Sequence, residues 1–175
     1  MFEVEIKVRI SDIKAIRDVI QSSGGVFSET LIEKDQYYNA PHRDFKKTDE
    51  ALRIRETDNE TVLTYKGPKE TIQGSKVRSE TNLLVNSAKS ADTMLLSLGF
   101  FRVAVVTKKR EYWKYQDFSI ALDEVEGLGS FIEIELISDT NLADVANRID
   151  RFSKELGIFG ERITVSYLEL LSTTQ

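Results

Sequence analysis

Charged residues recur at alternate positions along several segments, and this pattern constrains the fold more than any other feature of the chain. Within residues 3–10, charged side chains occupy the odd positions, and Val4, Ile6, Val8 and Ile10 occupy the even ones. Side chains two residues apart in a strand share a face and lie about 7 Å apart. Each such segment therefore predicts a strand with one charged face and one apolar face. The spacing returns in four later sets: Arg53/Arg55, Lys76/Arg78/Glu80, Lys108/Arg110 and Glu133/Glu135.

The charges are sorted by sign as well as by position. Basic residues dominate some segments and paired glutamates occupy others, whereas a strand face that only meets solvent usually mixes both signs with Ser and Thr. One interpretation is a sheet with one hydrated face and one core face. The other is a sheet that curls into a barrel with its charged face inside. In that case nine basic side chains converge on the interior: Lys7, Arg9, Arg53, Arg55, Lys66, Lys76, Arg78, Lys108 and Arg110.

An interior of this kind calls for a ligand that compensates both signs of charge. Like charges held close together repel strongly unless another charge offsets them. A polyanion would offset the basic side chains. The acidic pairs Glu3/Glu5 and Glu133/Glu135 offer the hard oxygen ligands that suit Mg²⁺ or Mn²⁺. A metal-bound polyphosphate supplies both partners at once.

The rest of the chain predicts an α+β fold that is rich in antiparallel strands. Apolar residues at helical spacing and the flanking capping residues predict helices over residues 12–23, 90–98, 141–156 and 164–171. Period-two patterns and turn signals predict strands over residues 3–10, 26–38, 51–56, 61–66, 76–85, 103–115, 118–125 and 130–137. Gly67-Pro68 is expected to end a strand, and residues 69–75 are expected to form a mobile loop.

The composition excludes several classes of site. The chain has no cysteine, so disulfides, thiolate metal sites and cysteine nucleophiles are excluded, and a single histidine, His42, excludes a multi-histidine metal site. No glycine-rich loop with P-loop spacing is present. A net charge of -5 does not favour binding to nucleic acid or to a membrane surface.

Length and hydropathy patterning set the expected organisation. The 175 residues contain no linker-like shift in composition, so we expect a single domain over residues 1–175. There is no run of about 18 apolar residues and no continuous apolar stretch near the N-terminus. We therefore expect no membrane span, no signal peptide and a cytoplasmic location, with a homodimer as a possible assembly.

The ordered series of motifs resembles the CYTH, or triphosphate tunnel metalloenzyme, superfamily. The segment Glu3-Val-Glu5-Ile-Lys7 is similar to the ExExK signature of that superfamily. The later motifs follow in the order that the superfamily shows: Leu52-Arg53-Ile-Arg55, Thr64-Tyr65-Lys66, Lys108-x-Arg110 and Phe131-Ile-Glu133-Ile-Glu135. The resemblance covers residue 3 to about residue 171. It implies a closed antiparallel eight-stranded β-barrel with flanking helices, which binds a triphosphate together with a divalent metal.

Further segments resemble the class IV adenylyl cyclase branch of this superfamily. They are Asp35-Gln-Tyr-Tyr-Asn39, Arg43-Asp-Phe45, Thr48-Asp-Glu-Ala-Leu-Arg53 and Leu122-Asp123-Glu-Val-Glu-Gly-Leu-Gly129. The branch implies a cyclase that converts ATP to cyclic AMP and pyrophosphate. It also contains triphosphatases that act on inorganic, thiamine or nucleoside triphosphate, so that activity stays open. A non-enzymatic polyphosphate-binding module is the third alternative, although binding alone does not need two pairs of carboxylates.

The resemblance also assigns expected roles to individual residues. Four glutamates, Glu3, Glu5, Glu133 and Glu135, are the expected ligands of Mg²⁺ or Mn²⁺. Asp123 is expected to orient or deprotonate the nucleophile, with Lys108 and Arg110 as the other catalytic candidates. Arginine binds phosphate through a planar fork and lysine as a point charge. The expected phosphate ligands are Lys7, Arg53, Arg55, Lys66, Lys76, Arg78, Lys108 and Arg110.

Overall fold

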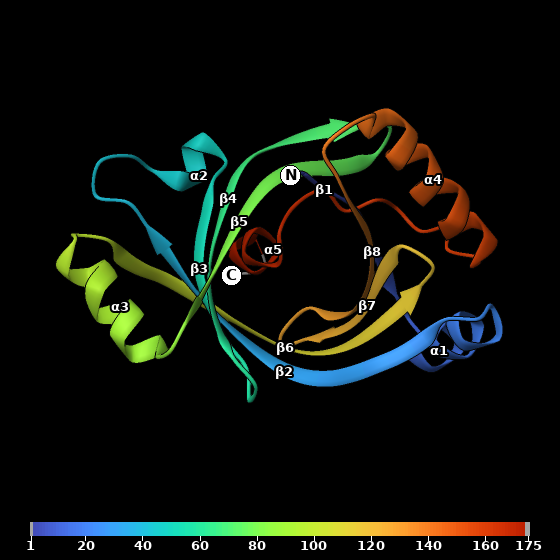
Figure 1. The fold of residues 1–175 in the computed structure, drawn as a ribbon, viewed down its shortest axis with the longest axis horizontal. Helices are drawn as coiled ribbons and strands as arrows, with labels where there is room; N and C mark the ends of the chain where they lie inside the picture. Colours follow the sequence, from blue (N-terminus) through green and yellow to red (C-terminus); the bar gives the residue numbers. More distant parts are fainter. Residues whose placement is uncertain (1, 174–175) are drawn as a thin grey trace.

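Eight antiparallel strands joined in a ring form the centre of the computed structural model, which describes residues 2–173 (Figure 1). The strands are β1 (Phe2–Ile10), β2 (Val26–Asn39), β3 (Ala51–Glu56), β4 (Thr61–Ile72), β5 (Ser75–Val85), β6 (Phe101–Tyr115), β7 (Phe118–Val125) and β8 (Gly129–Ser138). Their order around the ring is β1-β5-β4-β3-β2-β6-β7-β8, and the pairing of β8 with β1 closes it. The closed ring and the α+β class agree with the expectation from sequence.

The alternation of charged and apolar residues decides which face of each strand points into the ring. On β1, Glu5 and Lys7 point inward, while Val4, Ile6 and Val8 point outward into the main core. The same division holds on β8, where Ile132 and Ile134 join that core. The period of two along the strands therefore sorts ionisable groups to the inside and apolar side chains to the outside.

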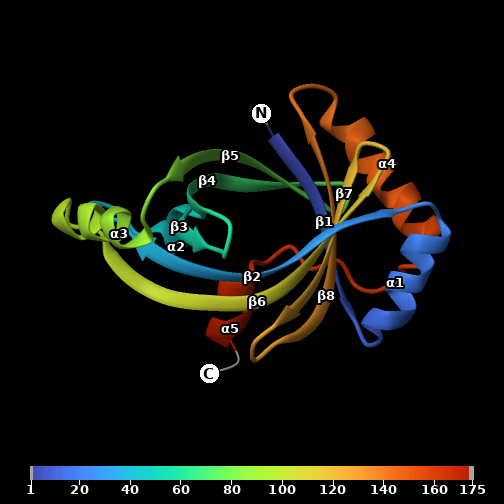
Figure 2. The same ribbon diagram turned by 60° about the horizontal axis from the view of Figure 1, so that its bottom comes forward.

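Two long helices cover the outside of the ring on one side (Figure 2). They are α1 (Ile13–Ser22) and α4 (Leu142–Glu155). The carboxylate of Asp12 caps α1 by accepting from the backbone N–H of Ala15 at 2.9 Å. Phe152 of α4 stacks on Tyr115 and Phe118, with ring centroids 4.8 and 4.4 Å away. Apolar burial under these helices forms the largest core cluster of the molecule.

A second, smaller core lies at the opposite side of the ring, under α2 (Phe45–Thr48) and α3 (Ala88–Ser97). Phe45 and Leu95 pack there against Leu52 and Ile54, the outward residues of β3. The sequence predicted α3 but not α2, which is a single turn of helix that Asp44 caps.

The C-terminal helix α5 (Tyr167–Thr173) lies in the opening of the ring instead of on its outer surface (Figure 1). Tyr167 packs against Tyr37, Val106 and Phe131, which are inward residues at one end of their strands. The helix therefore covers one of the two ends of the ring.

The hairpin of β4 and β5 differs from the sequence expectation. Residues 69–75 were expected to form a mobile loop, but β4 continues to Ile72 and pairs with β5 as far as the turn at Gln73-Gly74. Gly67-Pro68 forms an irregularity between Lys66 and Lys69 and does not end the strand. Strands tolerate proline at such bulges because no ladder hydrogen bond is required there.

No helix within residues 2–173 has the length and apolarity needed to cross a membrane.

Candidate functional site

The inside of the ring holds a central cavity of about 310 Å³. All eight predicted phosphate ligands line it, and so do all four predicted metal ligands. Arg9 does not line the cavity: its side chain is exposed, donates to the carbonyl of Leu128 and lies over the ring of Phe131. The structure thus brings together residues that are up to 132 positions apart in the sequence, from Glu3 to Glu135.

Acidic and basic residues face one another across neighbouring strands, an arrangement that the sign pattern along each strand did not reveal. Opposite charges placed directly across an antiparallel pair attract. Within residues 2–173, seven such pairs belong to the inward face of the ring: Glu3–Arg78, Glu5–Lys76, Lys7–Glu133, Asp35–Arg55, Glu33–Lys108, Lys66–Glu80 and Arg110–Asp123. The basic side chains are therefore compensated by carboxylates, and a ligand is not required to prevent their mutual repulsion.

Glu33 and Asp35, two fully covered carboxylates of β2, hold the basic side chains of one wall in place. Lys108 Nζ lies 2.8 Å from Glu33 Oε2 and 3.4 Å from Asp35 Oδ2, and Arg55 Nε donates to Asp35 Oδ1 at 2.7 Å. Burial acts to raise the pKa of Glu33, but Arg110, Lys108 and Arg55 lower it to about 2. Burial lowers the pKa of Lys108.

The sequence analysis missed Glu33 and Asp35 as site residues. They have the same i, i+2 spacing within a predicted strand as the pairs that it singled out. That spacing was the signal that could have found them.

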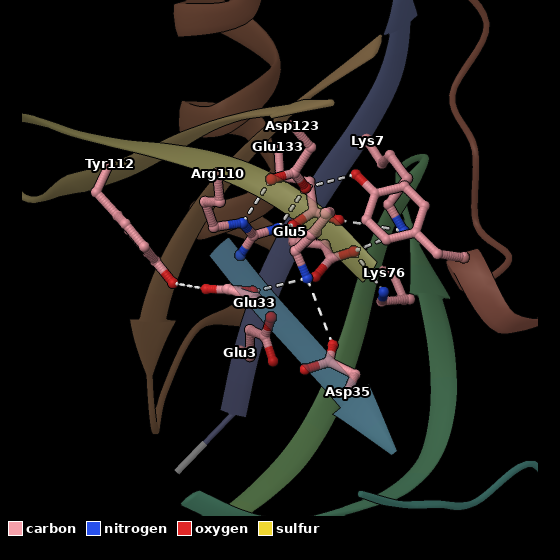
Figure 3. A network of polar contacts seen from close by, with 12 residues as sticks. Glu3, Glu5, Lys7, Glu33, Asp35, Lys76, Arg110, Tyr112, Asp123 and Glu133 are labelled. Carbon is pink, nitrogen blue, oxygen red and sulfur yellow. Dashed lines mark hydrogen bonds and ion pairs between the residues drawn. The ribbon is translucent and has the colours of Figure 1, made fainter. Parts of the chain in front are cut away.

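Arg110 is the centre of a second network (Figure 3). Its guanidinium donates to both carboxylate oxygens of Asp123, at 2.6 and 2.5 Å, and also contacts Glu133. The hydroxyl of Tyr167 donates to Asp123 Oδ2 at 2.7 Å. Asp123 is fully buried and does not line the cavity, because Arg110 and Tyr167 lie between its carboxylate and the open space. This geometry fits a residue that orients Arg110, and it leaves the predicted proton transfer by Asp123 without a direct path to a ligand.

Glu3, Glu5 and Glu135 form the most acidic part of the cavity wall. Glu135 lies directly opposite Glu5 in the pairing of β1 with β8, and it has no ion pair among the described residues. Burial raises the pKa of Glu135 to about 8, with further contributions from Glu3 and Glu5. Two like charges across a strand pair are destabilising. A cation bound at this part of the wall would relieve the repulsion between Glu5 and Glu135.

The carboxylates are not gathered into a preformed metal centre. Within residues 2–173, no group of three or more Asp, Glu or His side chains is close enough to hold a metal ion by itself. Lys66 Nζ contacts Glu3 and Glu80, at 2.7 and 2.5 Å, and Lys76 Nζ contacts Glu5. Glu80 is an ion-pair partner of Lys66.

Arg78 differs from the other basic side chains of the cavity. Its guanidinium donates to the backbone carbonyls of Gly67 and Asp49, the latter at 2.6 Å. These bonds hold the bulge of β4 against the start of β3. Arg78 therefore has a structural task in addition to any contact with a ligand.

Comparisons with known proteins give a family for the chain and relatives that align over nearly its whole length. The family model described as the CYTH domain matches residues 1–167. A protein of Methanocaldococcus jannaschii, whose name suggests an adenylate cyclase, is 40% identical over 173 residues, which are 97% of this chain and 98% of the relative. The adenylate cyclase CyaB of Aeromonas hydrophila is 27% identical over 173 residues, covering 97% of this chain and 88% of the relative.

Solved structures with the same fold include proteins with and without a named activity. The PH1819 protein of Pyrococcus horikoshii superposes with a TM-score of 0.88 at 36% identity, and the match covers 99% of both chains. A Hippeastrum protein, described as a suggested adenylyl cyclase with a dominant triphosphatase activity, superposes with a TM-score of 0.72 at 20% identity over 99% of this chain and 96% of its own. The second likeness concerns the fold alone.

Proposed function

We propose that this chain, which belongs to the CYTH domain family, is a metal-dependent adenylyl cyclase that converts ATP to cyclic AMP and pyrophosphate. The observation that carries this proposal is the central cavity, in which eight basic side chains surround a space of about 310 Å³ next to the acidic group Glu3, Glu5 and Glu135. Two relatives that align over nearly the whole chain carry adenylate cyclase names, which supports the same activity.

The basic side chains would bind the three phosphate groups. Arg53, Arg55 and Arg110 approach from different strands, and Lys7, Lys66, Lys76 and Lys108 complete the surrounding wall. Each of them is paired with a carboxylate on a neighbouring strand, which directs it into the cavity. The basic side chains are thus placed around the cavity before a ligand binds, which favours electrostatic stabilisation of charge that develops during the reaction.

The acidic group fits a hard divalent cation by the chemistry of its donors. Mg²⁺ is usually held by one or two carboxylates together with water and substrate phosphates, not by a cage made only of protein. Glu135 and Glu5 can supply those carboxylates, and Glu3 lies on the same face of β1 as Glu5. When bound, the metal would neutralise charge on the phosphates and activate the attacking oxygen.

The reaction forms one bond and breaks another at the α-phosphorus. The ribose 3′-oxygen attacks this phosphorus, the bond to the bridging oxygen of the leaving pyrophosphate breaks, and the hydroxyl proton is released. Lys108 and Arg110 would stabilise the negative charge on the transferred and leaving groups. Asp123 would keep the guanidinium of Arg110 in a fixed orientation through its two hydrogen bonds.

Product analysis tests the proposal. Phosphorus NMR of the protein with ATP and Mg²⁺ or Mn²⁺ should show cyclic AMP and pyrophosphate. With 3′-deoxy-ATP, which keeps the phosphates and the base but lacks the nucleophile, no pyrophosphate should form and the compound should act only as an inhibitor. Orthophosphate from both nucleotides would contradict the cyclase assignment.

A triphosphatase is the second candidate for the same cavity. The observation in its favour is the Hippeastrum protein, which has the same fold and a cyclase-like name but is described by a dominant triphosphatase activity. In this reaction water would attack the terminal phosphorus, and only the phosphates need to be held. Rapid release of orthophosphate from inorganic triphosphate would select this candidate.

A further inference from the structure

The ion pairs of the ring fall into two kinds, which differ in where the carboxylate lies. In the first kind the carboxylate lies behind its basic partner. Glu33, Asp35 and Asp123 are at most 1% exposed and do not line the central cavity, although the lysine and arginines that they hold do line it. A phosphate in the cavity can therefore contact these basic side chains while their ion pairs stay intact.

In the second kind of ion pair, both partners line the central cavity. Lys76 Nζ contacts Glu5 (Figure 3), and Lys66 Nζ lies 2.7 Å from Glu3 Oε2. In the proposed function the two glutamates are candidate metal ligands and the two lysines are candidate phosphate ligands. Each pair therefore occupies a ligand for the metal and a ligand for the phosphates at the same time.

Lys76 depends on a single carboxylate. Within residues 2–173 its Nζ forms an ion pair with Glu5 alone, and both side chains are buried. Lys66 differs, because it also contacts Glu80, at 2.5 Å, and keeps that partner if Glu3 moves away. Separation of Glu5 from Lys76 thus leaves a buried ammonium group that needs a new anionic partner.

Glu5 lies between two neighbours that act on it in opposite directions. Strand β1 pairs with β5 on one side and β8 on the other, so Glu5 is directly opposite both Lys76 and Glu135. Lys76 attracts the carboxylate and Glu135 repels it. Lys7 Nζ is more distant from Glu5, at 3.9 Å, than from Glu133, at 3.2 Å. A divalent cation held by Glu135 would turn the repulsion into attraction, which gives Glu5 a choice between a lysine and a metal.

From this geometry we infer that the Glu5–Lys76 ion pair couples the binding of the metal to the binding of the polyphosphate. Without either ligand, the pair masks one metal ligand and one phosphate ligand. Metal binding by Glu5 frees Lys76 for phosphate, and phosphate binding by Lys76 frees Glu5 for the metal. The first ligand breaks the pair and the second binds without that cost, so each raises the affinity for the other. The inference rests on the proposed function, because it assumes that both ligands occupy the cavity.

Binding of the metal alone tests one half of the coupling. Lys76→Met removes the ammonium group and keeps most of the side chain. Calorimetric titration with Mn²⁺, without any phosphate, should show that this variant binds at least about tenfold more tightly than wild type, because Glu5 no longer has to leave a partner. Lys108→Met is the matched control: it removes the same charge from the same cavity, but Lys108 pairs with Glu33 and Asp35. Its affinity for Mn²⁺ should stay close to that of wild type.

Binding of tripolyphosphate in EDTA tests the other half. Glu5→Gln should bind tripolyphosphate at least about tenfold more tightly than wild type, because Lys76 is then free to contact it. Glu135→Gln is the control, since it removes a neighbouring carboxylate that has no ion pair within residues 2–173 and so frees no lysine. Circular dichroism checks that each variant is folded. The two titrations use different variants, so each tests the inference independently of the other.

The outcomes separate failure of the inference from failure of the proposed function. If Lys76→Met and Lys108→Met raise the affinity for Mn²⁺ equally, the gain comes from the loss of a positive charge, and the coupling through the ion pair is wrong. An unchanged affinity of Glu5→Gln for tripolyphosphate overturns it as well. If neither Mn²⁺ nor tripolyphosphate binds the wild-type protein or any of the variants, the proposed function itself is wrong.

Discussion

At the scale of single residues, ionisable groups are placed in cross-strand pairs that are almost fully covered. Glu33 and Asp35 lie 0% and 1% exposed, between Lys108 and the arginines of β3. Removing one partner of such a buried pair leaves the other charge without compensation. The stability of the fold and the orientation of the site therefore depend on the same carboxylates.

Glu33→Gln should lower the free energy of unfolding at neutral pH and make that free energy depend less on pH in the acid range. The pKa of Glu33 is about 2 in the folded protein, below its ordinary value of 4.5. The ionised carboxylate of Glu33 makes its full contribution to the stability of the fold above pH 4.5. This contribution, about 3 kcal/mol at most, is lost as the pH falls toward 2. We expect a loss of about 3–5 kcal/mol at pH 7, measured by urea unfolding, and a flatter profile between pH 4.5 and 2.

The matched control for this prediction is Glu29→Gln, an exposed position on the same strand. It should change the free energy of unfolding by less than about 0.5 kcal/mol. If the free energy of unfolding falls equally in wild type and Glu33→Gln between pH 4.5 and 2, the pKa of Glu33 is not lowered in the folded protein.

Glu135→Gln should impair metal-dependent turnover while the fold survives. Glu135 has no ion pair within residues 2–173, whereas Glu133 contacts both Lys7 and Arg110, so substitution of Glu133 would also leave buried cations unpaired. We expect Glu135→Gln to raise the Mg²⁺ concentration required for half-maximal activity by at least about tenfold. Activity within twofold of wild type at ordinary Mg²⁺ would contradict a role in metal binding.

The metal-free stability of this variant serves as its control. The pKa of Glu135 is raised to about 8, so the metal-free wild-type protein loses stability as the pH rises from 4.5 to 8. Glutamine removes that dependence and the repulsion with Glu5. Metal-free Glu135→Gln should therefore be at least as stable as wild type at pH 9, measured by thermal unfolding in EDTA.

At the scale of elements, α5 connects the end of the ring to the catalytic candidates. Lys69 Nζ on β4 contacts Glu169 at 3.0 Å, and Tyr167 reaches the buried Asp123 from inside the ring. Lys7 Nζ lies 4.2 Å from the centre of the Tyr167 ring, a cation–π distance. A seven-residue helix thus covers one end of the ring and supplies a third hydrogen bond to Asp123, the carboxylate that orients Arg110.

Tyr167→Phe should test that connection. The change removes one hydrogen bond to a buried carboxylate and keeps the packing of the aromatic side chain, so we expect a loss of about 1–3 kcal/mol in the free energy of unfolding. Tyr115→Phe is the control, because the Tyr115 hydroxyl has no hydrogen bond among the described residues while its ring stacks on Phe152. A loss of equal size in both variants would mean that the hydroxyl of Tyr167 contributes nothing specific.

At the scale of the whole molecule, the ring encloses nearly balanced charge. Within residues 2–173, eight acidic residues of the strands line the interior of the ring or pair with its basic side chains: Glu3, Glu5, Glu33, Asp35, Glu80, Asp123, Glu133 and Glu135. They match the eight basic residues of the cavity, so the fold does not require a ligand to keep its strands together. A polyanion instead competes with these carboxylates for the basic side chains. Its binding is most favourable where a metal ion compensates the carboxylates that it displaces.

Tripolyphosphate with Mg²⁺ should raise the melting temperature well above the effect of chloride at equal ionic strength. A ligand that binds only the folded state stabilises it by about 2.7 kcal/mol at a hundredfold excess over its dissociation constant. For a chain of this size that corresponds to a rise of about 5–10 °C. Differential scanning fluorimetry with and without Mg²⁺ measures it. Equal shifts with both salts would rule out a specific polyphosphate site.

Which face of each strand carries the ionisable groups follows from the sequence alone, because the period of two is a local property of an extended chain. That pattern left a hydrated open sheet and a closed barrel as alternatives, and the family resemblance favoured the barrel. The two together predicted the closed ring and the eight basic residues and four glutamates that line its cavity, although the pattern also placed Arg9 inside. The two-residue spacing of Glu33 and Asp35 was also visible, although their role was not.

Which charges meet one another depends on the order of the strands around the closed ring. Strand order places β1 beside β5 and β2 beside β6, and these neighbours determine that Glu5 faces Lys76 and Glu33 faces Lys108. Burial of Asp123 behind Arg110 and entry of α5 into the ring also depend on closure. The reason is physical: alternation follows from backbone geometry within one strand, whereas partners, burial and the open end of the ring depend on contacts between residues that are distant along the chain.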